Sequence, residues 1–111
     1  MQYFRKNIDY AKILDLKSLV PYVEGKVVSQ ALVQTDLLNM TVFAIDKGEE
    51  LNFQSASGEA MIYVIDGKME AKIWGEEYYL HEGEAIVVPA NISYQFTAVE
   101  RLMVLSTIVN P

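Results

Sequence analysis

The sequence predicts a single all-β domain of short antiparallel strands closed into a sandwich or barrel. Three observations predict it. Apolar residues recur with period two along most of the chain after residue 25, and Lys68–Ile73 alternates polar and apolar side chains without a fault. Turn signals separate these segments at short, regular intervals. The length of 111 residues, with 51% hydrophobic and 22% charged residues, suits one globular core.

Turn residues divide the patterned region into short segments, each of strand length. A strong hairpin signal, Asp66-Gly67, separates two of these segments and predicts that they pair with each other. The predicted strands are Val27–Gln34, Met40–Ile45, Leu51–Phe53, Met61–Ile65, Lys68–Ile73, Tyr78–Leu80, Ala85–Val88, Ile92–Thr97 and Leu102–Val109.

The first 25 residues have a different pattern. Ala11–Leu14 is predicted as a short edge strand, and Asp15 as the cap of a single helical turn that runs through Val20 and ends at Pro21. We therefore divide the chain into an N-terminal extension, residues 1–25, and a barrel, residues 26–111.

Charge and composition exclude several classes of function. The net charge is −6, from 15 acidic and 9 basic residues without a basic cluster, so we expect no binding to nucleic acid. The absence of cysteine removes disulfides and zinc–thiolate sites. The sequence shows neither the apolar core of a signal peptide near Met1 nor a membrane-length apolar run, so we expect a cytoplasmic protein without membrane contact.

Three predicted strands are apolar on both faces, namely Met61–Ile65, Ile86–Val88 and Leu102–Leu105. One face of each strand fills the barrel, and the other face needs a cover. The N-terminal extension could supply that cover alone. The extension is short, however, and we expect a homodimer.

The spacing of glycine and proline between Val27 and Val109 resembles that of the small single-domain cupins. The first cupin motif runs from Gly through His-x-His and Glu to a second Gly, and Gly48 and Gly67 have the correct separation. The second motif contains Gly, five residues and Pro-x-Gly, which Gly83 and Pro89 match. The resemblance implies an antiparallel double-stranded β-helix, the jelly-roll barrel of the cupins.

The metal-ligand positions of the family are substituted in this sequence. The two histidines of the first motif fall on Gln54 and Ala56, its glutamate falls on Ala60, and the histidine of the second motif falls on Tyr94. Amide, methyl and protonated phenol groups are poor ligands for transition metals. We expect no metal and no cofactor. Glu59, beside Ala60, should point away from the cavity unless a bulge turns it inward.

Residues at the former ligand positions are expected to hydrogen-bond or to line a pocket. Ligands of one ion lie about 3 Å apart, close to hydrogen-bond distance, so we predict a hydrogen bond from Gln54 to Tyr94. Either these residues line a pocket or they pack the barrel shut. The candidate ligand-binding residues are Gln54, Ala56, Ala60, Ile62, Tyr94 and Phe96, with Met40 or Met103 filling a gap, and Val64 shares their inward parity.

The favoured hypothesis is a metal-free barrel that binds a small, mostly apolar molecule or acts through its dimer surface. The alternatives are a metal-dependent dioxygenase or isomerase that uses Glu59, Tyr94 and Gln54, and a sensor or accessory subunit. No catalytic residue is assigned, and enzymatic activity is left open. The one histidine, His81, lies beside a predicted turn and is expected to be exposed to solvent.

Overall fold

The computed structural model describes residues 5–53 and 57–111 and forms two antiparallel sheets that pack face to face. Sheet A has the order β1-β2-β9-β4-β7, and sheet B has the order β3-β8-β5-β6. The strands are β1 (Val27–Gln34), β2 (Leu38–Ile45), β3 (Glu50–Phe53), β4 (Glu59–Asp66), β5 (Lys68–Ile73), β6 (Glu76–His81), β7 (Ala85–Val88), β8 (Tyr94–Ala98) and β9 (Leu102–Val109).

All nine predicted strands are confirmed, with shifts of one or two residues at some ends. The alternation on β4 illustrates why the pattern was informative. Ala60, Ile62 and Val64 are buried between the sheets, whereas the residues between them point outward. Because strand side chains alternate between the faces of a sheet, the buried positions fix the register of the whole strand.

The predicted hairpin at Asp66-Gly67 is wrong. The strands on either side lie in different sheets, since β4 pairs with β7 and β9, whereas β5 pairs with β6 and β8. Gly67 has a φ of 85°, the left-handed conformation expected at a tight turn, but here the turn carries the chain from one sheet to the other.

The N-terminal segment lies against the outer face of sheet A. Ala11–Leu14 is not a strand, and Ala11 has a φ of 53°, which interrupts an extended backbone. A bridge between Arg5 and Val33 links the segment to β1 instead. The predicted helical turn is a 3-10 helix, η1 (Leu16–Ser18), and the side chain of Asp15 caps it by accepting a hydrogen bond from the Lys17 N–H.

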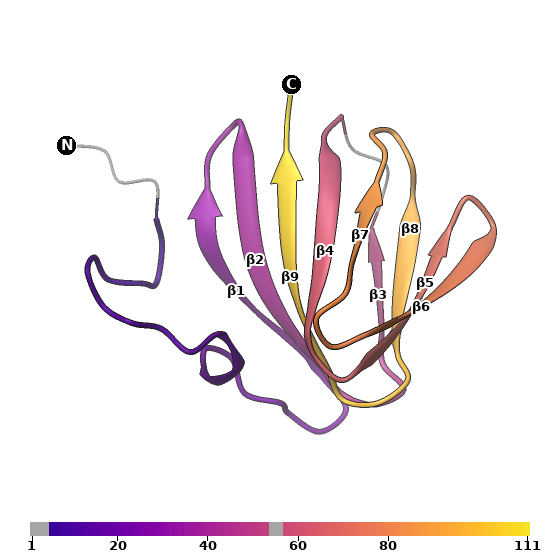
Figure 1. The fold of residues 1–111 in the computed structure, drawn as a ribbon, viewed down its shortest axis with the longest axis horizontal. Coiled ribbons are helices and arrows are strands. Elements are labelled where there is room, and N and C mark those ends of the chain that lie inside the picture. The colour runs from indigo at the N-terminus through magenta and orange to yellow at the C-terminus, as the bar shows by residue number, and fades with distance from the viewer. Residues whose placement is uncertain (1–4, 54–56) are drawn as a thin grey trace.

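Further contacts fix the second half of this segment. The Tyr22 hydroxyl donates a hydrogen bond of 2.8 Å to the Asp66 carboxylate, and the Gly25 N–H donates one of 2.7 Å to Asp46. Figure 1 shows the segment running outside the sandwich beside β1, whereas β9 leads to the C-terminus at the centre of sheet A. Among the described residues, no helix is long and apolar enough to cross a membrane.

Candidate functional site

The interior of the sandwich is walled by apolar side chains from both sheets. Ala60 and Ile62 face inward from β4, and Phe96 faces them from β8. All three are buried, so the inward orientation predicted for these residues and for Val64 is confirmed. Their burial places the predicted site inside the barrel core, where they form part of a close-packed wall.

Met40 does not belong to this interior. On β2, Phe43 and Ile45 face the interior, whereas Met40, Val42 and Ala44 pack in a second cluster on the outer face of sheet A. Met40 therefore packs outside the barrel interior, and Met103 belongs to the same outer cluster. The prediction that a methionine fills a gap near the site is wrong. Because β2 is apolar on both faces, the sequence pattern does not show which of its side chains face the interior.

One end of the interior contains a cluster of aromatic rings, which we call the aromatic cluster and which comprises Phe43, Phe53, Tyr94 and Phe96. Phe53 and Tyr94 are cross-strand neighbours on β3 and β8, and their rings stack with centroids 4.8 Å apart and planes at 14°. The ring centroids of Phe96 and Tyr94 are 5.3 Å apart, and those of Phe43 and Phe53 are 5.8 Å apart. Such geometry adds about 0.5–1.5 kcal/mol per pair to the burial of the rings.

This end is the mouth of the barrel. Tyr94 is the first residue of β8 and pairs with Ile73, the last residue of β5, so the turn after β5 and the loop before β8 meet here. In Figure 1 the loop between β7 and β8 lies at the upper end of the view, at the same end as the C-terminus. Asn91 lies in that loop with a φ of 63°, a left-handed conformation that asparagine adopts more readily than most residues.

The Tyr94 hydroxyl is the polar group that the aromatic cluster carries. Burial raises the pKa of this phenol above its ordinary value of 10.0, so the group is protonated at neutral pH. Within the described part of the chain the hydroxyl forms no hydrogen bond. Gln54 and Ala56 lie outside the described residues, and the hydrogen bond from Gln54 to Tyr94 stays a prediction.

An open depression of about 400 Å³ lies at the rim of the mouth. Phe53 and Tyr94 line it together with Ser93 and with three residues at outward positions of sheet B, namely Asn52, Lys72 and Gln95. Gln95 donates a hydrogen bond of 2.6 Å to Glu50, which fixes the orientation of its amide. Sequence reasoning missed these polar residues, although the outward parity of Asn52 on its strand could have identified one of them.

The two described residues at the ligand positions that the resemblance implies, Ala60 and Tyr94, do not fit a transition metal. Ala60 is buried and has no donor atom, and Tyr94 offers a protonated phenol. Among residues 5–53 and 57–111, no group of three or more histidines or carboxylates could hold a metal ion. His81 is exposed at the end of β6 remote from the mouth, as predicted.

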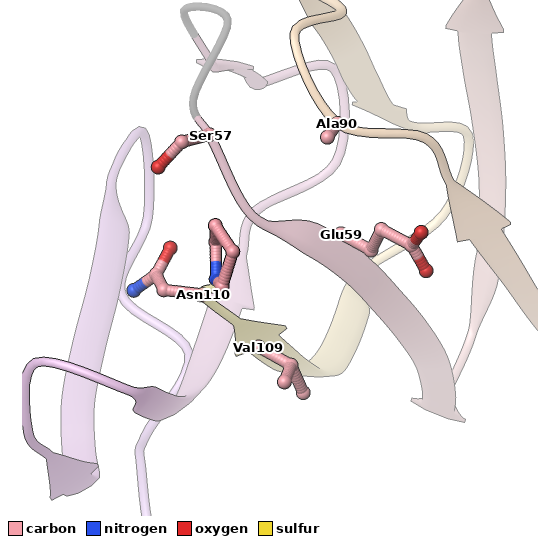
Figure 2. Close-up of a pocket in the computed structure, with 6 residues that line it drawn as sticks. Ser57, Glu59, Ala90, Val109 and Asn110 are labelled. Carbon is pink, nitrogen blue, oxygen red and sulfur yellow. The ribbon is translucent and has the colours of Figure 1, made fainter.

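Glu59 points away from the interior. It is exposed at the start of β4, where the strand is regular, and lines a depression on the outside of sheet A. Figure 2 shows its carboxylate directed away from Ser57 and Asn110. The outward orientation expected of a regular strand is confirmed, and the alternative in which a bulge turns this carboxylate inward is not adopted.

Comparisons with known proteins agree with this geometry. A family model described as "Cupin domain" matches residues 41–108. A conserved protein of unknown function from Streptococcus pyogenes is 38% identical, with a TM-score of 0.93 over 99% of this chain and 96% of that chain. A cupin superfamily protein from Desulfitobacterium hafniense is 22% identical, with a TM-score of 0.89 over 96% of this chain and 98% of that one.

A third solved structure is longer than this chain. A cupin 2 conserved barrel domain protein from Leptotrichia buccalis is 22% identical, with a TM-score of 0.90 over 94% of this chain and 50% of that chain. No curated protein matches the sequence.

Proposed function

Because this chain belongs to the cupin family, whereas the sequence places poor metal donors at the ligand positions that the motifs imply, we propose that it binds a small, mostly apolar molecule at the barrel mouth. The observation that carries the proposal is the half-buried Tyr94 hydroxyl, which lies among phenylalanine rings without a hydrogen-bond partner in the described part of the chain. Because Tyr94 is only partly buried, a ligand that bonds to this hydroxyl exchanges a hydrogen bond with water for one with the protein, and such a bond contributes about 0.5–1.5 kcal/mol net.

The aromatic cluster supports a planar, apolar ligand. Phe53 and Tyr94 pack against the interior and also line the depression at the rim, so a ligand at this end of the barrel would lie beside their stacked rings. Ligand sites of this kind combine apolar walls with a small number of polar groups that set orientation. Here the protonated Tyr94 would donate a hydrogen bond, which favours a ligand with a carbonyl or ether oxygen.

Binding without turnover is the simplest function that this set of residues supports. General acid–base catalysis needs a base within hydrogen-bond reach of the substrate. Among the described residues that line the mouth, none is a histidine or a carboxylate that faces the interior. The site can therefore orient and shield a molecule, and it lacks a described group that would accept a proton from it.

The test uses acetophenone, a planar aromatic ketone, and ethylbenzene, its analogue without an oxygen. We expect acetophenone to shift the amide resonances of β3 and β8 in heteronuclear NMR spectra, and Tyr94→Phe to weaken its binding about 5-fold, as loss of one hydrogen bond predicts. Ethylbenzene should bind both proteins equally. Tyr79→Phe serves as the matched control because Tyr79 lies on the outer face of sheet B.

Two results would refute the proposal. The first is resonance shifts that map away from the mouth or do not occur with either probe. The second is one equivalent of a transition metal in protein purified without an affinity tag or a chelator, which would restore the metal-dependent alternative.

A further inference from the structure

Sheet B ends at β6, a strand with one unpaired edge. It pairs with β5 on one side and with no strand on the other, in the part of the chain that the structure describes. Five of its six residues are exposed, and only Leu80 is buried. Figure 1 shows the β5–β6 hairpin at the side of the sandwich, with its turn projecting from the rest of the fold. The free edge of β6 is therefore open to solvent.

The backbone groups of an antiparallel strand point alternately to its two edges. His81 shows which residues of β6 face the open edge. Its N–H donates a hydrogen bond of 2.7 Å to the Glu84 carboxylate, and its carbonyl accepts one of 3.0 Å from the Glu84 N–H. Glu77 and Tyr79 share the parity of His81, so their N–H and C=O groups also point away from β5. Among the described residues no backbone group bonds to these two there, so the edge offers a row of free donors and acceptors.

The side chains along this edge carry negative charge. Glu76 and Glu77 are both exposed, and within the described part of the chain neither belongs to an ion pair. Lys72 is the cross-strand neighbour of Glu77, but its ammonium group lies 3.8 Å from the carboxylate of Glu70 instead. A cationic partner would therefore meet carboxylates that the chain itself does not neutralise.

Exposed aromatic rings lie beside these carboxylates. Tyr78 and Tyr79 are consecutive residues of the strand, so their exposed rings lie on opposite faces of sheet B. The Tyr78 hydroxyl donates a hydrogen bond of 2.8 Å to Glu76, which raises the pKa of the phenol. Trp74 is exposed in the turn that leads into the strand. Aromatic faces next to carboxylates favour lysine and arginine side chains, through cation–π contacts and through charge.

We propose that the free edge of β6 docks an extended basic segment of another protein, which adds a strand to sheet B. Strand addition obtains its affinity from main-chain hydrogen bonds and its specificity from alternate side chains. An antiparallel segment would bond to the backbone of Glu77 and Tyr79. It would place an apolar residue opposite Tyr78 and basic residues opposite Glu76 and Glu77.

A second copy of this chain fits the edge poorly. Pairing of β6 with β6 would align glutamates from both copies along one short ladder, and like charges on neighbouring strands are destabilising. Docking at this edge does not require a ligand at the barrel mouth.

The first experiment titrates the isotope-labelled full chain with the blocked peptide acetyl-Thr-Arg-Val-Arg-Lys-Thr-amide and follows the backbone amide resonances. We expect the largest shifts at Glu77 and Tyr79, and an affinity that falls as salt is added. The analogue with glutamate in place of each basic residue should not bind. Equal affinity for the two peptides, or shifts that map to another strand edge such as β3 or β7, would overturn the proposal.

A modified peptide separates strand addition from attraction between charges. Its two arginines lie opposite Tyr79 and Glu77 in the proposed register, so their backbone N–H groups donate to β6. Methylation of these two backbone nitrogens removes both donors and keeps every charge. We expect the affinity to fall at least about 10-fold, as the loss of two hydrogen bonds predicts. An unchanged affinity would show that the peptide does not add a strand.

The double variant Glu76→Gln/Glu77→Gln tests the carboxylates. It should weaken the basic peptide about 5-fold, because two exposed charge contacts are lost. Glu24→Gln/Glu100→Gln is the matched control, since it makes the same change in net charge at exposed residues outside β6 and should keep the wild-type affinity. The dispersion of the amide resonances confirms that both variants are folded.

Three results with these proteins would overturn the proposal. The first is a folded Glu76→Gln/Glu77→Gln variant that binds as tightly as wild type, and the second is a control that loses as much affinity. The third is a set of β6 resonances that shift with protein concentration in the absence of peptide, which would assign the edge to a second copy of the chain.

Discussion

The backbone at Gly67 lies so close to the carbonyl oxygen of Arg101 that an added Cβ would overlap that oxygen. This contact lies at the corner where the chain passes from sheet A to sheet B, and Gly67 also has a φ of 85°. Gly83 has a similar φ of 88° with open space around it. Gly83 is therefore required only for its backbone conformation, whereas Gly67 is required both for its conformation and because no Cβ fits beside Arg101.

Gly83→Ala should cost about 1 kcal/mol of stability, the penalty for a left-handed conformation with a Cβ. Gly67→Ala should cost at least twice as much, because the backbone near Arg101 must also move. Urea denaturation of both variants measures the difference. Equal losses would show that the corner adjusts without strain.

Trp74 should be a destabilising residue. It occupies the two-residue turn between β5 and β6 with a φ of 55°, followed by Gly75 with a φ of 75°, and it is 66% exposed. Turns with two positive φ values favour Asn-Gly, whereas a bulky residue is strained there. We expect Trp74→Asn to raise stability by about 1 kcal/mol, or roughly 4–8 °C in Tm. Trp74→Phe, which retains the strain, should give no gain in calorimetry.

Asp46 should make stability depend on pH in acid. Its carboxylate accepts hydrogen bonds from the Gly25 N–H at 2.7 Å and from Arg101 Nε at 2.9 Å, and these lower its pKa below the ordinary 3.8. The stabilisation is present above that ordinary value and is lost as pH falls through the lowered pKa. The stability gap between wild type and Asp46→Asn should therefore be constant near neutral pH and narrow below about pH 4.

The control for that measurement is Asp9→Asn, which removes the exposed ion pair of Asp9 with Lys12, 3.5 Å apart. Exposed pairs of this kind contribute little to stability. Urea midpoints measured from pH 2.5 to pH 7 compare the two variants. A gap for Asp46→Asn that does not change over this range would contradict the prediction.

The Tyr94 phenol should lose its proton at a higher pH than an exposed tyrosine. Burial raises its pKa, so the folded protein holds this proton more tightly than the unfolded chain does, and stability falls as pH rises above the ordinary value of 10.0. The difference in absorbance at 295 nm between wild type and Tyr94→Phe isolates this phenol from the other six of the seven tyrosines. We expect its midpoint above 10.0, and a midpoint at or below that value would indicate an exposed hydroxyl.

The period-two pattern predicted the strands because most of them have one face exposed to solvent. Lys68–Ile73 shows this clearly, with Met69, Ala71 and Ile73 buried and Lys72 exposed. On β2 both faces are buried, so the pattern does not show which residues face the interior. The prediction therefore placed Met40 in the interior, whereas it packs on the outer face of sheet A. It also could not distinguish a hairpin at Asp66-Gly67 from a crossover, because both use the same turn residues.

The candidate site was predicted in part. The parities of Tyr94 and Phe96 follow from the strand pattern and from the motif spacing. The contribution of Phe53 could not be predicted, because its stacking on Tyr94 depends on the pairing of β3 with β8, two strands far apart in the sequence. The sequence pattern also predicted outward apolar residues that need a cover, and among them Met61 and Val87 are exposed in this chain.

The central position of β9 has a consequence for biosynthesis. This strand is the last in the sequence, yet it lies between β2 and β4 and bonds to both. Until β9 has been synthesised, sheet A therefore consists of two separate parts, β1 with β2 and β4 with β7. Until β9 leaves the exit tunnel, β2 can pair only with β1 and β4 only with β7, so each has one unpaired edge, and we expect nascent chains to depend on chaperones that shield exposed strand edges.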